Sequence, residues 1–294
     1  MKPLLKFLRG LTSLFIYFCN TLFWCIPLFL MALFKLVIPV APFRKWCSKI
    51  LTAIASGWVG VNNMNQRLFS NTSMTVQGLE GFSVKKRYLV VANHQSWVDI
   101  LVLQRIFHRK IPFLKFFLKK ELRWFPLLGQ AWWALDFPFM KRYSRQFLQK
   151  KPHLKGKDLE ITRKACEKFR TSPVSIMNFV EGTRFTAEKH MKQRSPYRNL
   201  LKSKAGGIAH VLSSMGDQLN AILDVTIVYP KNVKSFWAFA CGDLHEIKIR
   251  VRAVPVTKDL LGNYAIDKSF QTRFHNWLNA LWEKKDRTIQ EMLP

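Results

Sequence analysis

Acidic residues are scarce in this chain of 294 residues. It carries 18 Asp and Glu against 47 Lys and Arg, which gives a formal net charge of +29 at pH 7. Because that excess is far larger than solubility requires, we expect anionic partners. Nucleic acid, anionic lipid headgroups, phosphorylated metabolites and acidic carrier proteins all fit, and net charge does not separate them. The ten Trp and 24 Phe favour a membrane interface, where aromatic and cationic side chains occur together.

Cysteine pairs and cofactor motifs are also missing. The five cysteines include no Cys-x-x-Cys pair, and no histidine stands at a spacing typical of zinc sites. An odd number of unpaired cysteines indicates a reduced protein that faces the cytoplasm. The sequence has neither a Walker loop nor a dinucleotide-binding glycine pattern, so we expect no bound cofactor and no metal.

Charged side chains are absent from residues 11–34, a run long enough to cross a bilayer core of about 30 Å. Basic residues precede the run, as in a signal peptide, but its apolar region is too long and no small-residue cleavage site follows. We therefore expect a retained membrane anchor. Basic residues on both flanks leave its orientation open. Pro27 and Pro39 allow a second arrangement, in which two shorter helices enter one leaflet and return.

The rest of the chain alternates between strand-like and helix-like segments. We expect two parts: an N-terminal part at 1–69, in which an interfacial helix at 43–69 follows the membrane anchor, and a globular domain at 70–294. Strands are predicted at 75–77, 88–92, 174–180, 221–229, 233–241 and 246–254, and helices at 98–107, 158–169, 205–214 and 267–292. Helices between strands in the middle, followed mainly by strands, indicate an α/β domain with a single mixed sheet.

A polar turn follows the apolar strand predicted at 88–92, and it carries Asn93, His94 and Asp99. Imidazole takes up a proton near neutral pH, and a nearby carboxylate can fix its tautomer and stabilise its charged form. Residues five apart differ by about 140° around a helix axis, so the pair meets only if the chain turns between them. Composition alone gives about a one-in-five chance of this spacing, and a helix-capping Asp99 explains it equally well.

A second polar cluster, Glu181-Gly-Thr-Arg184, follows the strand predicted at 174–180. Together the two clusters resemble the PlsC-like glycerolipid acyltransferases, a family that includes the 1-acyl-sn-glycerol-3-phosphate acyltransferases. Asn93, His94 and Asp99 match the first family block, and Phe179 with 181–184 matches the third.

Two further blocks of the family are similar but less complete. Residues 136–142 look like the second block, and residues 119–122 are also similar to the family's pattern. The fourth block usually centres on a proline within a strand, whereas residues 222–227 contain Asp224 and no proline. The resemblance covers roughly residues 70 to 230.

The resemblance implies direct transfer of a fatty acyl group from a thioester to the sn-2 hydroxyl of a lysophospholipid. The donor would be acyl-CoA or acyl carrier protein, and 1-acylglycerol-3-phosphate would give phosphatidic acid. Lysophosphatidylglycerol and lysocardiolipin stay open as acceptors. The resemblance also implies the cell inner membrane, with the active site facing the cytoplasm and the basic surface on anionic lipid.

Each site residue has an expected role. His94 would be the general base and Asp99 its orienting carboxylate, while Asn93 or backbone amides of the turn would stabilise the oxyanion. Arg184 would bind the acceptor phosphate, because a guanidinium forms paired charged hydrogen bonds with it. Weaker phosphate candidates and pocket-forming residues are Lys120, Arg142, Glu181, Gly182 and Thr183.

Two non-enzymatic readings compete with the transferase. A membrane-anchored nucleic-acid-binding protein would account for the net charge and the aromatic residues. It leaves both polar clusters unexplained, so we expect no nucleic-acid partner. A membrane scaffold with a decayed site is disfavoured because the first and third blocks are complete.

Overall fold

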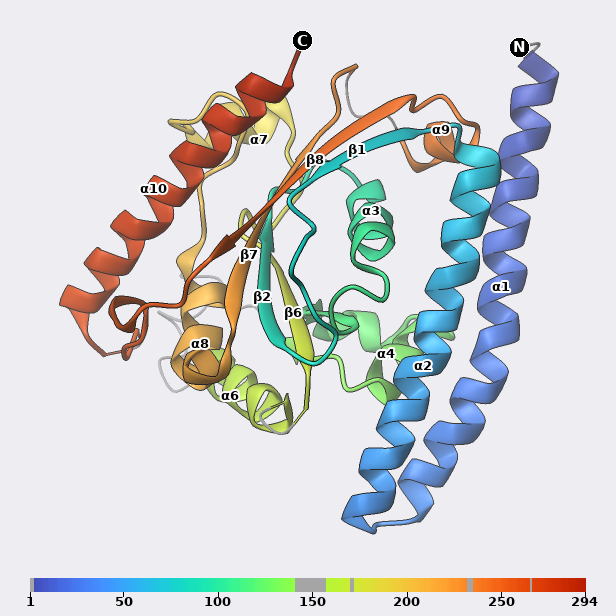
Figure 1. Cartoon of the computed structure of the whole chain (residues 1–294), viewed down its shortest axis with the longest axis horizontal. Helices are drawn as coiled ribbons and strands as arrows, with labels where there is room; N and C mark the ends of the chain where they lie inside the picture. The colour runs from blue at the N-terminus through green and yellow to red at the C-terminus, as the bar shows by residue number, and fades with distance from the viewer. Residues whose placement is uncertain (1–2, 141–156, 170–171, 232–234, 265) are drawn as a thin grey trace.

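A six-stranded mixed sheet forms the centre of the protein, with helices on both faces (Figure 1). The computed structural model describes residues 3–140, 157–169, 172–231, 235–264 and 266–294. The strand order is β1-β8-β7-β2-β6-β3; β7 and β8 are antiparallel, and the other neighbouring pairs are parallel. The strands are β1 (Ser73–Gln77), β2 (Arg87–Ala92), β3 (Leu114–Phe116), β6 (Val174–Phe179), β7 (Ala221–Val228) and β8 (Glu246–Val254).

The sheet separates two apolar cores. Alternate residues of a strand point to opposite faces, so Val90 of β2 contacts one core and Leu89 the other. The first core is covered by α1 (Pro3–Val37), α2 (Ala41–Asn65), α3 (Val98–Phe107) and α4 (Leu128–Ala134). The second is covered by α6 (Lys157–Phe169), α8 (Ala205–Met215) and α10 (Lys268–Met292).

Short elements complete the chain. They are the π-helix η1 (Gln66–Ser70), the small sheet of β4 (Leu118–Lys119) and β5 (Phe139–Met140), the 3-10 helices η2 (Lys120–Trp124), η4 (Gly216–Gln218) and η5 (Lys258–Leu260), and the helices α7 (Ala187–Gln193) and α9 (Phe236–Ala240).

The mixed α/β sheet is confirmed, and the strand predicted at 233–241 is wrong. Residues 236–240 form the helix α9 instead. The Ser235 hydroxyl accepts a hydrogen bond from the Ala238 amide at 3.2 Å and caps this helix. A short apolar run fits a strand or a buried helix equally well, and here the cap decides.

The two N-terminal helices form an antiparallel hairpin that packs against the sheet domain (Figure 1). Helix α1 continues through Pro27, and the chain turns only after Val37, beside Pro39. Asn20 of α1 donates to the Asn62 side chain at 2.8 Å and to the Trp58 carbonyl at 3.0 Å, both in α2. Leu28 of α1 and Leu51 of α2 belong to the first core, so the hairpin is continuous with the domain.

Helix α1 leaves most of its apolar surface uncovered. Its 35 residues span about 52 Å at 1.5 Å per residue, and its length and composition suffice to cross a bilayer. Only 17% of its most apolar 18-residue window is buried. Exposed side chains along it include Phe15, Phe18, Phe23, Ile26 and Leu30. An apolar surface of this extent suggests association with a membrane.

The hairpin depends on a close approach at Gly57 of α2. A Cβ atom at Gly57 would lie 2.4 Å from the Trp24 ring, whereas one at Gly60 would meet only His108, at 3.4 Å. We expect Gly57→Ala to destabilise the protein by about 1–3 kcal/mol, because the ring must move. Gly60→Ala should be neutral or stabilising, since alanine favours helix. Thermal unfolding in detergent measures both, and equal shifts of Tm would contradict the prediction.

Candidate active site

The two polar clusters meet at one edge of the sheet. Strands β2 and β6 are parallel neighbours, and Ala92 pairs in register with Phe179. Because parallel strands end on the same edge, the turn after Ala92 lies beside the turn after Phe179. This pairing brings His94 and Glu181 into contact.

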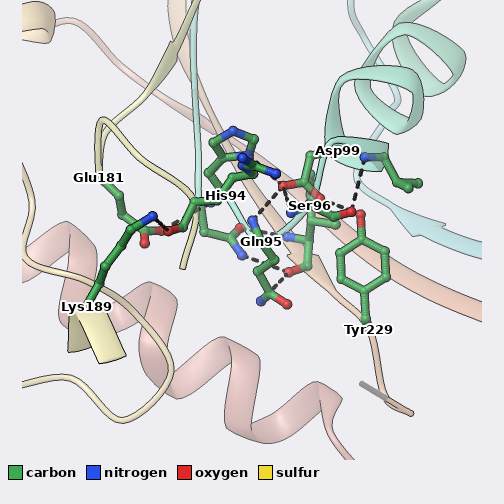
Figure 2. Close-up of polar contacts among 11 residues, drawn as sticks. His94, Gln95, Ser96, Asp99, Glu181, Lys189 and Tyr229 are labelled. Carbon is green, nitrogen blue, oxygen red and sulfur yellow. Dashed lines mark hydrogen bonds and ion pairs between the residues drawn. The ribbon is translucent and has the colours of Figure 1, made fainter. Parts of the chain in front are cut away.

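His94 and Asp99 form the pair that their spacing predicts. The distance from His94 Nδ1 to Asp99 Oδ2 is 2.8 Å (Figure 2). The same oxygen accepts the backbone amides of Gln95 at 2.6 Å and Ser96 at 2.9 Å. The Tyr229 hydroxyl at the end of β7 donates to the other oxygen, Oδ1. The carboxylate is wholly buried and thus fixes the imidazole from one side.

The imidazole is held from a second direction by an aromatic ring. Phe179 stacks on His94 with the ring centroids 3.8 Å apart and the planes 12° from parallel. The His94 side chain keeps 12% of its surface exposed. With Nδ1 engaged by Asp99, Nε2 is the nitrogen that can accept a proton from a bound molecule.

Glu181 lies beneath the histidine turn and connects it to a third segment. Its Oε1 accepts the His94 amide at 3.1 Å and its Oε2 accepts the Leu201 amide at 3.2 Å. The side chain is wholly buried. Burial raises the pKa of Glu181 to about 8; the two amides and the charge of Lys285 act in the opposite direction without offsetting it.

Gly182, Thr183 and Arg184 form the turn that follows Glu181. Gly182 has a φ of 68°, a conformation that glycine adopts without strain. The Arg184 guanidinium lies over the Trp97 ring, 4.5 Å from its centroid, which is a cation–π contact. Lys189 of α7 donates to the Thr183 hydroxyl at 2.9 Å, so two cations flank this turn.

Asn93 is committed to the sheet. Its side-chain nitrogen donates to the Ile227 carbonyl at 2.8 Å, and its side-chain oxygen accepts the Ile227 amide at 2.9 Å. The residue is wholly buried. Both polar atoms therefore join the end of β2 to β7.

The two remaining phosphate candidates lie elsewhere. Lys120 is exposed at the start of η2 and makes no hydrogen bond to the two clusters within the described ranges. Arg142 belongs to the segment 141–156, outside the described residues. In the part of the chain that the structure describes, no three His, Cys, Asp or Glu side chains are grouped so that they could hold a metal ion.

Tyr229 and Lys189 contact site residues, and the sequence did not identify either of them. Tyr229 ends the strand predicted at 221–229, but its bond to Asp99 requires β7 to lie next to β2. Lys189 stands in a basic segment where no single cation is distinctive, and the Thr186 cap that directs α7 was its only local signal.

Comparisons with known proteins find acyltransferases. The model of the family described as Acyltransferase matches residues 73–229. The mouse protein 1-acyl-sn-glycerol-3-phosphate acyltransferase epsilon is 25% identical over 230 residues, which cover 70% of this chain and 58% of that protein. Chicken lysocardiolipin acyltransferase 1 is 21% identical over 295 residues, 92% of this chain and 72% of that protein.

A solved structure shares the fold. The crystal structure of the 1-acyl-sn-glycerophosphate acyltransferase PlsC from Thermotoga maritima superposes with a TM-score of 0.55 and 18% sequence identity. The match covers 98% of this chain and 97% of the other. The likeness therefore extends over the N-terminal hairpin as well as the sheet.

The raised pKa of Glu181 predicts how stability varies with pH. Between its ordinary value of 4.5 and about 8, the folded state binds more protons at this carboxyl than the unfolded state does. The free energy of unfolding should therefore fall as the pH rises through this window. Glu181→Gln should remove that part of the slope.

Denaturant unfolding between pH 5 and 8 measures the difference. Glu188→Gln, which changes an exposed carboxylate in α7, is the matched control and should leave the slope unchanged. Parallel pH curves for the wild type and Glu181→Gln would contradict the assignment.

Proposed function

Because the chain belongs to the Acyltransferase family, we propose that it transfers a fatty acyl group from a thioester to the sn-2 hydroxyl of a lysophospholipid. The donor is acyl-CoA or acyl carrier protein, and the acceptor is 1-acylglycerol-3-phosphate, giving phosphatidic acid. The observation that carries this proposal is the His94–Asp99 pair, 2.8 Å apart, at a strand end next to Arg184. The names of the relatives support the acceptor class.

The reaction needs one base and no covalent enzyme intermediate. His94 Nε2 takes the proton of the acceptor hydroxyl while its oxygen attacks the thioester carbonyl carbon. Collapse of the tetrahedral intermediate breaks the carbon–sulfur bond, and the thiolate recovers the proton from His94. Asp99 stabilises the imidazolium between these two steps, because its buried carboxylate contacts Nδ1.

The acceptor phosphate binds at the cationic turn after β6. Arg184 presents a planar guanidinium that the Trp97 ring orients, and Lys189 adds a second positive charge beside Thr183. Gly182 gives the turn its shape. Lys120 and Arg142 are further phosphate ligands in this proposal. Their assignment rests on the family resemblance alone.

Asn93 supports the turn rather than the oxyanion. Its side chain is bonded to Ile227 at both ends, and the amides of His94, Gln95 and Ser96 donate to the carboxylates of Glu181 and Asp99. These donors hold the Glu181 and Asp99 side chains in place. A donor outside the 93–96 turn would then face the thioester oxygen.

In this proposal the enzyme lies at the cell inner membrane with its site toward the cytoplasm, and the exposed apolar surface of α1 supports its association with a membrane. A lysolipid then reaches the site from the bilayer, and the basic surface binds anionic headgroups. No bound cofactor is required, because the thioester is already activated.

A remodelling enzyme acting on lysocardiolipin or lysophosphatidylglycerol is the second candidate. The chicken lysocardiolipin acyltransferase supports it, since that relative matches 92% of this chain. Nucleic-acid binding has no comparable support, because it gives no role to the buried His94–Asp99 pair.

Removing the base should slow acyl transfer strongly. We expect His94→Ala and Asp99→Asn to lower kcat by about 10²- to 10⁴-fold, the range that general base catalysis contributes. Initial rates are measured on purified membranes with lysophosphatidic acid, lysophosphatidylglycerol and lysocardiolipin, each with both donors. His245→Ala, an exposed histidine, serves as the control. Wild-type rates in His94→Ala would exclude it as the base.

Arg184 should affect acceptor binding more than the chemical step. Loss of a charged hydrogen bond costs about 1.5–3 kcal/mol, so Arg184→Ala should lower kcat/KM for the phosphate acceptor by about 10- to 100-fold. Most of the change should lie in KM, and Arg184→Lys should recover part of it. Arg273→Ala on the exposed face of α10 is the control. An unchanged KM with every acceptor would rule out this phosphate site.

A further inference from the structure

The C-terminal helix α10 is hydrogen-bonded to a loop that has no role in the proposed chemistry. The loop comprises residues 194–204, between α7 and α8, and is called the α10-bound loop below. Asn279, Trp282 and Asp286 stand at positions i, i+3 and i+7 of α10, so they lie on one face of the helix. All three bond to the loop.

The Asp286 carboxylate binds backbone amides of the loop. Its Oδ2 accepts the Arg198 amide and its Oδ1 accepts the Asn199 amide, both at 2.8 Å. The Asn199 side chain adds a third bond at 3.1 Å. Asn279 accepts the Ser203 hydroxyl at 3.0 Å. A largely buried carboxylate with this many donors fixes the path of the loop.

Trp282 continues the contact toward the active site. It is wholly buried, and its indole N–H donates to the Leu201 carbonyl at 3.2 Å. The Leu201 amide donates to Glu181, and Glu181 accepts the amide of His94. Three hydrogen bonds therefore connect an α10 side chain to the backbone of the proposed base.

The helix is itself locked to the sheet by a buried ion pair. Lys285 of α10 is wholly buried, with its Nζ 2.5 Å from Asp224 Oδ1 and 2.5 Å from the Val225 carbonyl oxygen. Arg252 of β8 pairs with the other oxygen of Asp224. Because moving α10 along β7 would leave buried charges unpaired, the pair sets the register of the helix.

We propose that α10 is a positioning element of the active site, in which Trp282 and Asp286 hold the α10-bound loop so that Leu201 keeps Glu181 against the His94 amide. The proposed reaction gives neither residue a contact with substrate. The inference rests on the proposed function, since the reaction that it supports is acyl transfer by His94.

Trp282→Phe in the full-length protein tests this inference. The substitution removes the N–H donor and keeps an aromatic ring, so the Leu201 carbonyl loses its buried partner. We expect kcat to fall about tenfold with KM nearly unchanged. Trp277→Phe makes the same change on the same helix, where the ring packs on Phe274, and should leave kcat at the wild-type value.

A double-mutant cycle separates positioning from general destabilisation. If Trp282 acts through Glu181, Trp282→Phe should lower kcat less than twofold in a Glu181→Gln background. Full additivity of the two changes would overturn the inference. If Trp282→Phe lowers Tm by more than Trp277→Phe does, Asp286→Asn takes its place in the cycle, with Glu283→Gln as the charge-matched control on exposed α10 surface.

Amide hydrogen exchange tests the same link without using activity. Trp282→Phe should speed exchange in peptides covering 199–204 and 93–96, and Trp277→Phe should not. Unchanged exchange in an active Trp282→Phe enzyme would overturn the inference. A different result would separate the two proposals. If Trp282→Phe exchanges faster but the wild-type protein transfers acyl groups to no acceptor, the proposed function is refuted and the positioning role of α10 stands.

Discussion

The burial of one charge, the Asp99 carboxylate, determines the shape of the active site. A carboxylate without water is stable only when hydrogen-bond donors surround it. Two of these donors, the Gln95 and Ser96 amides, point inward only if the chain turns sharply after His94. That turn carries the imidazole onto the same carboxylate. Tyr229 supplies the donor on the other side, so β7 is needed as well.

The burial of acidic residues also makes the exposed surface more positive. Asp99, Glu181, Asp224 and Asp286 are all buried, although the chain has only 18 acidic residues. Among the buried residues of the described chain, Lys285 is the one Lys or Arg. The exposed surface is therefore more positive than the composition indicates. The positive surface and the uncovered apolar face of α1 both favour a site that meets an anionic membrane.

Local sequence signals predicted the long helices, most strands of the central sheet and half of the site. The apolar run 88–92 and the helix 98–107 follow from hydrophobic pattern, and the His94–Asp99 contact follows from a spacing that requires a turn. Contacts between distant segments could not be predicted, because they depend on the strand order. Tyr229 reaches Asp99 only since β7 is the neighbour of β2. In the sequence, Lys285 cannot be distinguished from an exposed lysine on an amphipathic helix, so its burial could not be predicted.

Asp224, which departs from the fourth block of the family, is explained by its ion pair with α10. A strand in the centre of a sheet accepts a buried carboxylate only when cations balance it, and Lys285 and Arg252 provide them from α10 and β8. Each member of this cluster depends on the others, because removing one leaves an unpaired charge in the core. Strand β7 therefore fixes α10, and α10 fixes the α10-bound loop beneath Glu181. A helix at the end of the chain is in this way part of the support for His94.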